Sequence, residues 1–174
     1  MINLPNLRQT FNYDCGATAL QAVLAYYGVE VREDELMSQL GCSPEGTPIN
    51  GLIEVAGKYG FRVEASLDTS IETVKQLVDE GFPVIILLQA WADRYMTVED
   101  WKTENESGHY VVVIAHTGNV IVFEDPSSLH RTWLTEDELF ARWHDVDDNG
   151  RELNRFAMVL KGKPPAGRMI KHMD

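Results

Sequence analysis

Four residues in this sequence could together carry out acyl transfer: Gln9, Cys15, His109 and Asp125. A thiol is a strong nucleophile only as its thiolate, which a helix N-terminus and a neighbouring histidine both stabilise. Cys15 stands where a helical pattern begins. The alternative for Cys15, a small buried core residue, is disfavoured because the apolar face of that helix starts only at Ala19. Cys15 is therefore the candidate nucleophile.

His109 is the histidine best placed to act as a base, because it opens the strongly apolar strand His109–His116. The other four histidines occur in turn, surface or tail contexts. A turn at Gly118-Asn119 joins this strand to Val120–Glu124, so the start of one strand should lie opposite the end of the other. We therefore expect Asp125 beside His109, where it would orient the imidazole. Alone, Asp125-Pro126 would indicate only a turn.

An oxyanion in such a site is usually stabilised by a backbone N–H near the nucleophile and a side-chain amide. Gln9 lies six residues before Cys15, in a segment rich in polar groups. The amide of Gln9 is the candidate donor.

Apolar periodicity and capping signals predict how these residues are positioned. We expect helices over 15–27, 33–40, 47–59, 69–81 and 135–143, with Thr47 and Thr69 as the caps of the third and fourth. Strands are expected over 61–65, 83–88, 109–116, 120–124 and 155–160. Helices in the first third and an antiparallel-leaning sheet in the rest indicate an α+β fold.

Two features of this layout leave questions for the structure. The long irregular stretch Ala90–Gly108 could be a lid over a site or a decorated surface loop. Trp133 and Trp143 flank the last helix, and both are expected in the core.

The length of 174 residues predicts one domain over residues 1–160, followed by a flexible basic tail over 161–174. A net charge of −12 disfavours nucleic-acid binding. No apolar run is long enough to cross a bilayer, and the N-terminus lacks the pattern of a secretory signal, so a cytoplasmic protein is the default.

The remaining candidate ligands and thiols are weak. Cys15 and Cys42 are the two cysteines; a disulfide is rare in a reducing compartment, and their spacing does not suit zinc. Cys42 is expected to be a packing or surface thiol. The acidic run Asp145–Gly150 lacks the ligand spacing of a calcium loop and predicts a solvated turn. We expect no metal and no cofactor.

The segments Gln9–Leu20, Tyr26-Tyr27-Gly28, Gly108–Val113 and Asp125-Pro126 together resemble the peptidase C39 family, in the same order along the chain. The resemblance implies a papain-like fold with N-terminal helices packed on an antiparallel sheet. It implies that Cys15 is the nucleophile, His109 the base, Asp125 the orienting acid and Gln9 the oxyanion donor. Asp14, just before the nucleophile, is expected to cap the helix.

The family cleaves precursor peptides after a double-glycine leader, within peptide-exporting ABC transporters. The resemblance therefore implies a stand-alone cysteine peptidase acting on a peptide or small precursor protein, with a separately encoded exporter as partner. Two alternatives stay open: an acyl or amide transferase with the same triad, and a catalytically silent module that binds leader peptides.

Overall fold

A six-stranded antiparallel sheet organises the protein in the computed structural model, which describes residues 1–167. The strands lie side by side in the order β1-β6-β2-β3-β4-β5. Their bounds are β1 Arg62–Ser66, β2 Val84–Gln89, β3 Gly108–Thr117, β4 Val120–Glu124, β5 Thr132–Thr135 and β6 Ala157–Lys161.

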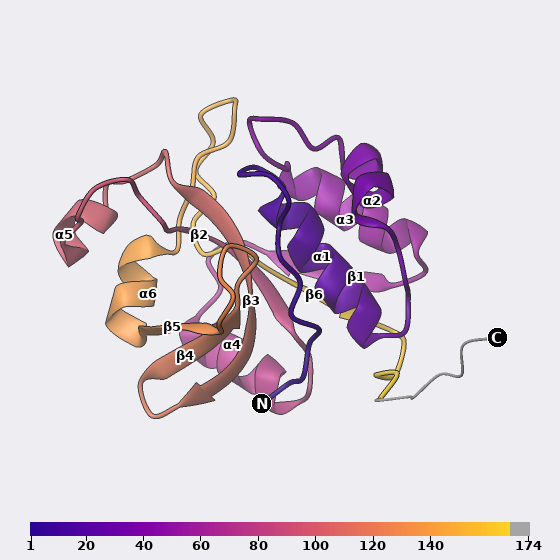
Figure 1. Cartoon of the computed structure of the whole chain (residues 1–174). Helices are drawn as coiled ribbons and strands as arrows, with labels where there is room; N and C mark the ends of the chain where they lie inside the picture. Colours follow the sequence, from indigo (N-terminus) through magenta and orange to yellow (C-terminus); the bar gives the residue numbers. More distant parts are fainter. Residues whose placement is uncertain (168–174) are drawn as a thin grey trace.

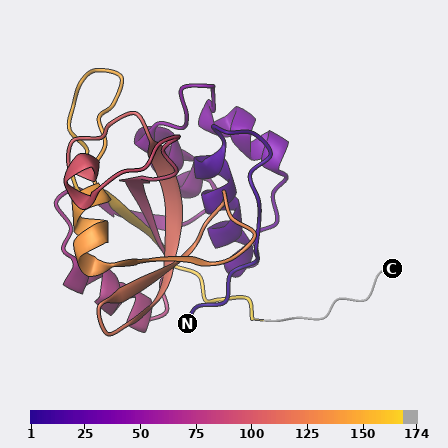
Figure 2. The same ribbon diagram turned by 60° about the vertical axis from the view of Figure 1, so that its left-hand side comes forward.

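Helices cover the sheet on both sides. Their bounds are α1 Cys15–Tyr26, α2 Glu33–Leu40, α3 Ile49–Lys58, α4 Ile71–Asp79, α5 Val98–Trp101 and α6 Glu136–Arg142. The three N-terminal helices lie on one side of β2 and β3, and α5 and α6 on the other (Figure 1). The turned view keeps these two groups apart, with the sheet between them (Figure 2). This is the expected α+β architecture of helices packed on an antiparallel sheet.

The central strands are apolar throughout because both of their faces are covered. Every residue of β2 is buried, and in β3 the run from His109 to Ile114 is buried as well. A strand with one wet face would instead alternate apolar and polar residues. The helices on the two sides therefore share β2 and β3 as their common core.

The predicted hairpin forms, but with an irregularity. Thr117 pairs with Val120 at the turn, and a register shift between Val113 and Ala115 places Glu124 opposite Val112. An inserted residue of this kind bends the strand and increases its twist. The continuation of β4 beyond Glu124 therefore reaches β3 two residues short of His109, at a diagonal distance that long side chains can bridge.

Several local expectations need correction. The stretch 90–108 contains the short helix α5, and β5 was not predicted. Trp143 is buried as expected, but Trp133 is 61% exposed because it lies on the edge strand β5. Pro48, not Thr47, occupies the cap position of α3, and Ser70, not Thr69, caps α4 by accepting a hydrogen bond from Thr73 N.

The predicted tail divides into two parts. Lys161 ends β6, and the residues that follow return to the N-terminal helices: Lys163 Nζ donates to Tyr59 O, and Ala166 N donates to Tyr26 O. Residues 168–174 lie outside the described part of the chain. Within residues 1–167, none of the helices has the length and apolar character needed to cross a membrane.

Candidate active site

Cys15 is the first residue of α1, as the sequence predicted, so its side chain lies at the positive end of the helix dipole. Asp14 precedes it in the cap position, but its carboxylate does not cap the helix. Instead it accepts hydrogen bonds from the backbone N–H groups of Thr10 and Phe11, at 3.0–3.2 Å. The capping role expected for Asp14 was therefore wrong: this fully buried residue fixes the loop between Gln9 and Cys15.

The backbone at Cys15 is held by close packing. A Cβ atom added to Gly16 would lie 2.9 Å from Thr47 Cβ and 3.0 Å from the Tyr110 ring. Tyr110 is anchored in turn by its hydroxyl, which donates to Thr47 O at 2.7 Å. Only glycine allows this approach, so the start of α1 is pressed against β3 at the position next to His109.

His109 and Asp125 are hydrogen-bonded neighbours. The distance from His109 Nε2 to Asp125 Oδ1 is 2.7 Å, and both residues are buried, with 5% and 3% of their surfaces exposed. Because Nε2 faces the carboxylate, Nδ1 is the ring nitrogen left to face a thiol. Cys15 interacts with the same ring, since its interaction raises the pKa of His109. The structure thus brings the three predicted residues into contact in the order cysteine, histidine, aspartate.

The charges in this group stabilise one another. Burial lowers the pKa of His109, but hydrogen bonds to Asp125 and Cys15 and the charges of both raise it overall, to about 9. Burial raises the pKa of Asp125, but the hydrogen bond and charge of His109 hold it below its ordinary value. An imidazolium flanked by a carboxylate and a thiol is therefore favoured at neutral pH, and it is the partner that a thiolate needs.

Asp125 accepts hydrogen bonds from other donors besides His109. Oδ1 also accepts the backbone N–H of Ser127, at 2.9 Å, and Oδ2 accepts Thr132 Oγ1 at 3.1 Å and Trp91 Nε1 at 3.2 Å. None of these three residues was identified from the sequence. Ser127 carried a signal, since an Asp side chain that accepts the N–H two residues later is a common turn motif. Trp91 and Thr132 carried none.

Gln9 contacts the residues that follow Asp125 in the chain. Its Oε1 accepts from Ser127 Oγ at 2.9 Å, and its backbone N–H donates to Pro126 O at 3.1 Å. Gln9 Nε2 donates to Phe11 O at 2.6 Å. A primary amide has two N–H groups, so a second one remains for an oxyanion. Ser127 therefore connects the candidate oxyanion donor to the candidate orienting acid.

Cys42 lies close to this site without belonging to it. Its Sγ contacts Tyr13 O and Thr47 Oγ1, each at 3.5 Å. Burial raises the pKa of its thiol, with a further contribution from nearby Asp14. The two cysteines are both free, and they differ in that Cys15 acts on the pKa of a histidine, His109.

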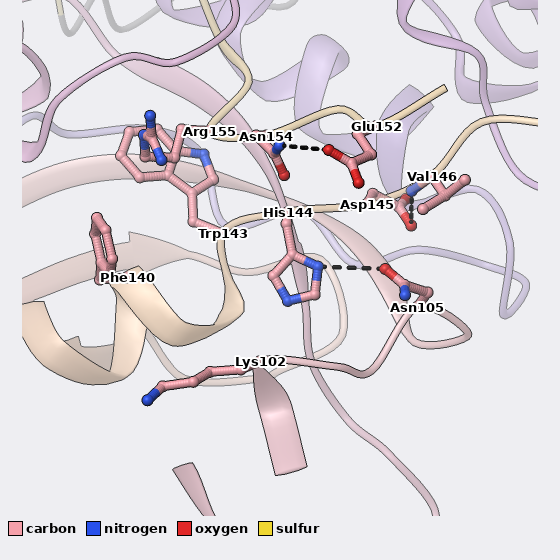
Figure 3. A pocket seen from close by; sticks show the side chains of 10 residues that line it. All are labelled: Lys102, Asn105, Phe140, Trp143, His144, Asp145, Val146, Glu152, Asn154 and Arg155. Carbon is pink, nitrogen blue, oxygen red and sulfur yellow. Dashed lines mark hydrogen bonds between the residues drawn. The ribbon is translucent and has the colours of Figure 1, made fainter. Parts of the chain in front are cut away.

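A separate hollow of about 240 Å³ lies beside α6 and contains another histidine and aspartate, His144 and Asp145. Figure 3 shows the His144 ring directed toward Asn105, and Asp145 turned away from that ring. No cysteine lines this hollow. Among residues 1–167, no group of three His, Cys, Asp or Glu side chains is arranged to hold a metal ion.

The loop that begins at Asp145 is the turn that the sequence predicted. Asp147 Oδ1 accepts the backbone N–H groups of Asn149 and Arg151, both at 2.9 Å, which closes the turn on itself. Asp145 is the exception, because it is partly buried and faces Gln89.

Comparison with known proteins gives a consistent assignment. The family model described as "Peptidase C39 family" matches residues 3–146. A curated relative, the pediocin PA-1 transport/processing ATP-binding protein PedD of Pediococcus acidilactici, is 27% identical over 135 residues. That match covers 76% of this chain but only 16% of the relative, so the chain spans about a sixth of the length of that protein.

Solved structures of the same fold cover nearly the whole chain. The peptidase domain of Streptococcus ComA, described as a bi-functional ABC transporter of a quorum-sensing pathway, has a TM-score of 0.67 at 22% identity, covering 92% of this chain and 98% of that one. A putative C39-like peptidase from Bacillus anthracis has a TM-score of 0.69 at 18% identity, covering 93% and 96%.

A third structure, a double glycine motif protease from an AMS/PCAT transporter in complex with the leader peptide, has a TM-score of 0.63 at 22% identity, covering 93% and 92%. At these identities the likeness shows the fold, and the family model supplies the membership. The chain belongs to the peptidase C39 family, whose peptidase domains are cysteine peptidases.

Proposed function

We propose that this protein hydrolyses a peptide bond with Cys15 as nucleophile, His109 as its base and as the acid that protonates the leaving amine, and Asp125 as the group that orients His109. The observation that carries the proposal is the chain of contacts from Cys15 through His109 to Asp125. The helix N-terminus and the imidazolium both favour a thiolate at Cys15.

The chemistry follows from this arrangement. The Cys15 thiolate adds to the carbonyl carbon, and the resulting oxyanion accepts a hydrogen bond from the second N–H of Gln9. His109 then gives its proton to the departing amine as the C–N bond breaks, which leaves a thioester. Water loses a proton to His109 and attacks the thioester carbonyl. The C–S bond then breaks, which releases the acid product and restores the Cys15 thiolate beside the protonated His109.

We propose that the residues before the cleaved bond are two glycines. Cys15 and His109 are only 7% and 5% exposed, so a substrate must bring its carbonyl group into a narrow space. A bulky side chain next to the cleaved bond would collide with the walls, whereas glycine would not. The solved relative described as a double glycine motif protease supports the same choice.

We also propose that the substrate is the leader of a precursor peptide, met in the cytoplasm, and that a separately encoded exporter carries away the product. The support is that PedD and ComA are named as transport proteins that include such a domain. In them, the domain is part of the transporter chain.

An internally quenched peptide containing Gly-Gly-Ala tests the reaction, with a matched Val-Val-Ala peptide to test the size limit. We expect cleavage after the second glycine, located by mass spectrometry, and none of the valine peptide. Cys15→Ala should abolish cleavage while Cys42→Ala, the matched control, retains it. Cleavage that survives Cys15→Ala would contradict the proposed nucleophile. A product that forms only with an added amine would favour a transferase, and binding without any product would favour a silent module.

Alkylation tests the thiolate without any peptide. At about pH 6, iodoacetamide should modify Cys15 much faster than Cys42, because a helix N-terminus and an imidazolium favour the Cys15 thiolate whereas burial raises the pKa of Cys42. Equal rates at the two cysteines, followed by mass spectrometry of the digested protein, would contradict thiolate activation.

A further inference from the structure

The segment from residue 90 to residue 107, which leaves β2 and returns to β3, is docked on α6. Its ends are joined by a hydrogen bond from Ala90 N to Ser107 O at 2.9 Å. Its helix α5 packs on α6, where Met96 and Trp101 are buried against Ala141. This hydrophobic contact holds the far part of the segment beside α6, as Figure 1 shows.

Trp91, near the start of this segment, does not join that contact. Its side chain is 58% exposed, so burial does little to hold it. Its backbone has a φ of 60°, a left-handed conformation that a bulky residue adopts only where its surroundings impose it. The hydrogen bond that the residue gains is the one from its indole Nε1 to Asp125 Oδ2, at 3.2 Å.

The four donors on Asp125 differ in origin. Ser127 and Thr132 follow Asp125 closely in the chain and belong to the same turn and the next strand. His109 comes from β3. Trp91 is the donor that reaches Asp125 from the segment docked on α6, 34 residues away in the sequence.

We propose that Trp91 is a positioning residue, whose indole N–H holds the carboxylate of Asp125 in the orientation that His109 requires. This inference rests on the proposed function of His109 and Asp125. With two donors on each oxygen, the carboxylate cannot rotate without breaking hydrogen bonds, and the His109 ring stays aimed at Cys15. The segment 90–107 thereby contributes to the site through Trp91, near its start.

Loss of the indole N–H of Trp91 should raise the pKa of Asp125. An N–H that donates to a carboxylate stabilises its ionised form, so its removal makes Asp125 easier to protonate. The charged groups that interact with Asp125 are His109 and Glu124; His109 interacts in turn with Cys15, and Glu124 with Arg131. None of these is altered by a change at Trp91, so the shift is attributable to the lost donor.

Trp91→Phe is the test, because it keeps an aromatic ring and removes the donor. Trp133→Phe is the matched control: Trp133 is 61% exposed, and it follows Thr132 on β5, so its side chain points away from the face that contacts Asp125. On the Gly-Gly-Ala peptide we expect Trp91→Phe to lower kcat about tenfold with KM changed by less than about twofold. The acid limb of the kcat profile should move to higher pH. The control should leave all three unchanged.

Proton NMR provides a readout that needs no peptide. The His109 Nε2–H proton, held between the ring and Asp125, should exchange with water faster in Trp91→Phe than in the unmodified protein, and not in Trp133→Phe. A lower kcat with neither a shift of the acid limb nor faster exchange would reduce Trp91 to a structural role and overturn the proposal. Unchanged kcat and exchange would overturn it too.

The two proposals can fail separately. If no peptide is cleaved by the unmodified protein, the proposed function fails, yet the exchange of the Nε2–H proton still decides whether Trp91 holds Asp125. If Trp91→Phe does not fold, Trp91→His, which offers a ring N–H of smaller reach, is measured for the same proton exchange. Exchange as slow as in the unmodified protein would then show that the indole is dispensable and overturn the proposal.

Discussion

Two regions of this protein place a histidine near an aspartate, but only one of these two pairs is joined by a hydrogen bond. His109 and Asp125 are 16 residues apart in the sequence, yet their side chains are 2.7 Å apart. His144 and Asp145 are adjacent in the sequence, and their side chains turn to different partners (Figure 3). The contact between ring and carboxylate, and a thiol on the other ring nitrogen, distinguish a candidate catalytic pair from two polar neighbours.

The partners of the second pair explain why it is structural. His144 Nε2 faces Trp101 O at 2.9 Å and Nδ1 faces Asn105 at 3.3 Å, so the ring ties the segment 90–107 to α6. Asp145 Oδ1 accepts from Gln89 Nε2 and from its own neighbour Val146 N, at 3.0 and 2.9 Å. Both side chains are used to hold chain segments together.

The pKa values of the two carboxylates shift in opposite directions, although burial acts on both in the same way. Burial raises the pKa of Asp145, and its hydrogen bonds do not reverse the shift. Burial also acts to raise the pKa of Asp125, but His109, Ser127 and Thr132 lower it overall. What surrounds a buried carboxylate, and not burial alone, decides whether it is kept charged.

The contrast between the two pairs requires that activity depend on His109 far more than on His144. We expect His109→Ala to lower kcat/KM by about 10⁴-fold or more, because the base, the acid and the partner of the thiolate are lost together. His144→Ala should change kcat/KM by less than about threefold, since both hydrogen bonds of the ring go to the docked segment. The Gly-Gly-Ala peptide provides the measurement. A large loss in His144→Ala, with the protein folded by circular dichroism, would move the site to the other pair.

The aspartates sharpen the same contrast. Asp125→Asn should lower kcat by about 10³–10⁴-fold, because an amide can present an N–H to His109 Nε2 and stabilise the wrong tautomer. Asp145→Asn should keep most of the activity. Both substitutions preserve the shape of the side chain. An equal loss of kcat in Asp125→Asn and Asp145→Asn would therefore contradict a specific role for Asp125.

Gln9 and Gln89 should differ in the same way, with smaller effects: Gln9 in activity and Gln89 in stability. Gln9→Ala should lower kcat about 10²–10³-fold with little change in stability, as expected for the loss of one oxyanion donor. Gln89 is fully buried and bonds Ser107 N, His144 O and Asp145. Gln89→Ala should therefore lower the free energy of unfolding by about 1–3 kcal/mol. Urea unfolding and peptide kinetics on both variants separate the two roles, and similar stability losses would contradict the assignment of Gln9.

The sequence predicted the part of the site that follows from regular structure. The apolar period placed Cys15 at a helix start, and the hairpin made His109 and Asp125 neighbours. It did not predict the irregularity between Val113 and Ala115, which makes the His109–Asp125 contact diagonal. A strand carrying one extra residue reads as an ordinary apolar run, so periodicity cannot reveal it.

The contacts that the sequence could not predict lie in segments without regular periodicity. Trp91 lies in a stretch without period, and its contact with Asp125 depends on how α5 docks on α6. Asp14 matched the pattern of a helix cap, yet its carboxylate turned to Thr10 and Phe11, because the loop before Cys15 offered free N–H groups. In both cases tertiary packing chose among partners that the local sequence leaves equivalent.

The pH dependence of stability gives the smallest expected effect, and it reports the opposite pKa shifts of Asp145 and Asp125. The folded-state pKa of Asp145 is raised, so the folded protein holds this proton more tightly than the unfolded chain, and the charged form costs stability as pH rises above about 4. The folded-state pKa of Asp125 is lowered, so its charge contributes stability above about pH 4, and that contribution is lost as pH falls through the folded value.

Relative to the unmodified protein, Asp145→Asn should therefore gain stability between about pH 3.5 and about pH 7, because the cost of charging the Asp145 carboxyl is removed. The fixed effect of replacing a carboxyl by an amide cancels in this difference between two pH values. Asp125→Asn is no matched control here, because it also removes a cause of the raised pKa of His109, so its pH profile reports the pair and not Asp125 alone. Free energies of unfolding from urea titrations provide the measurement. A loss of stability in Asp145→Asn over this range would contradict a raised folded-state pKa at Asp145.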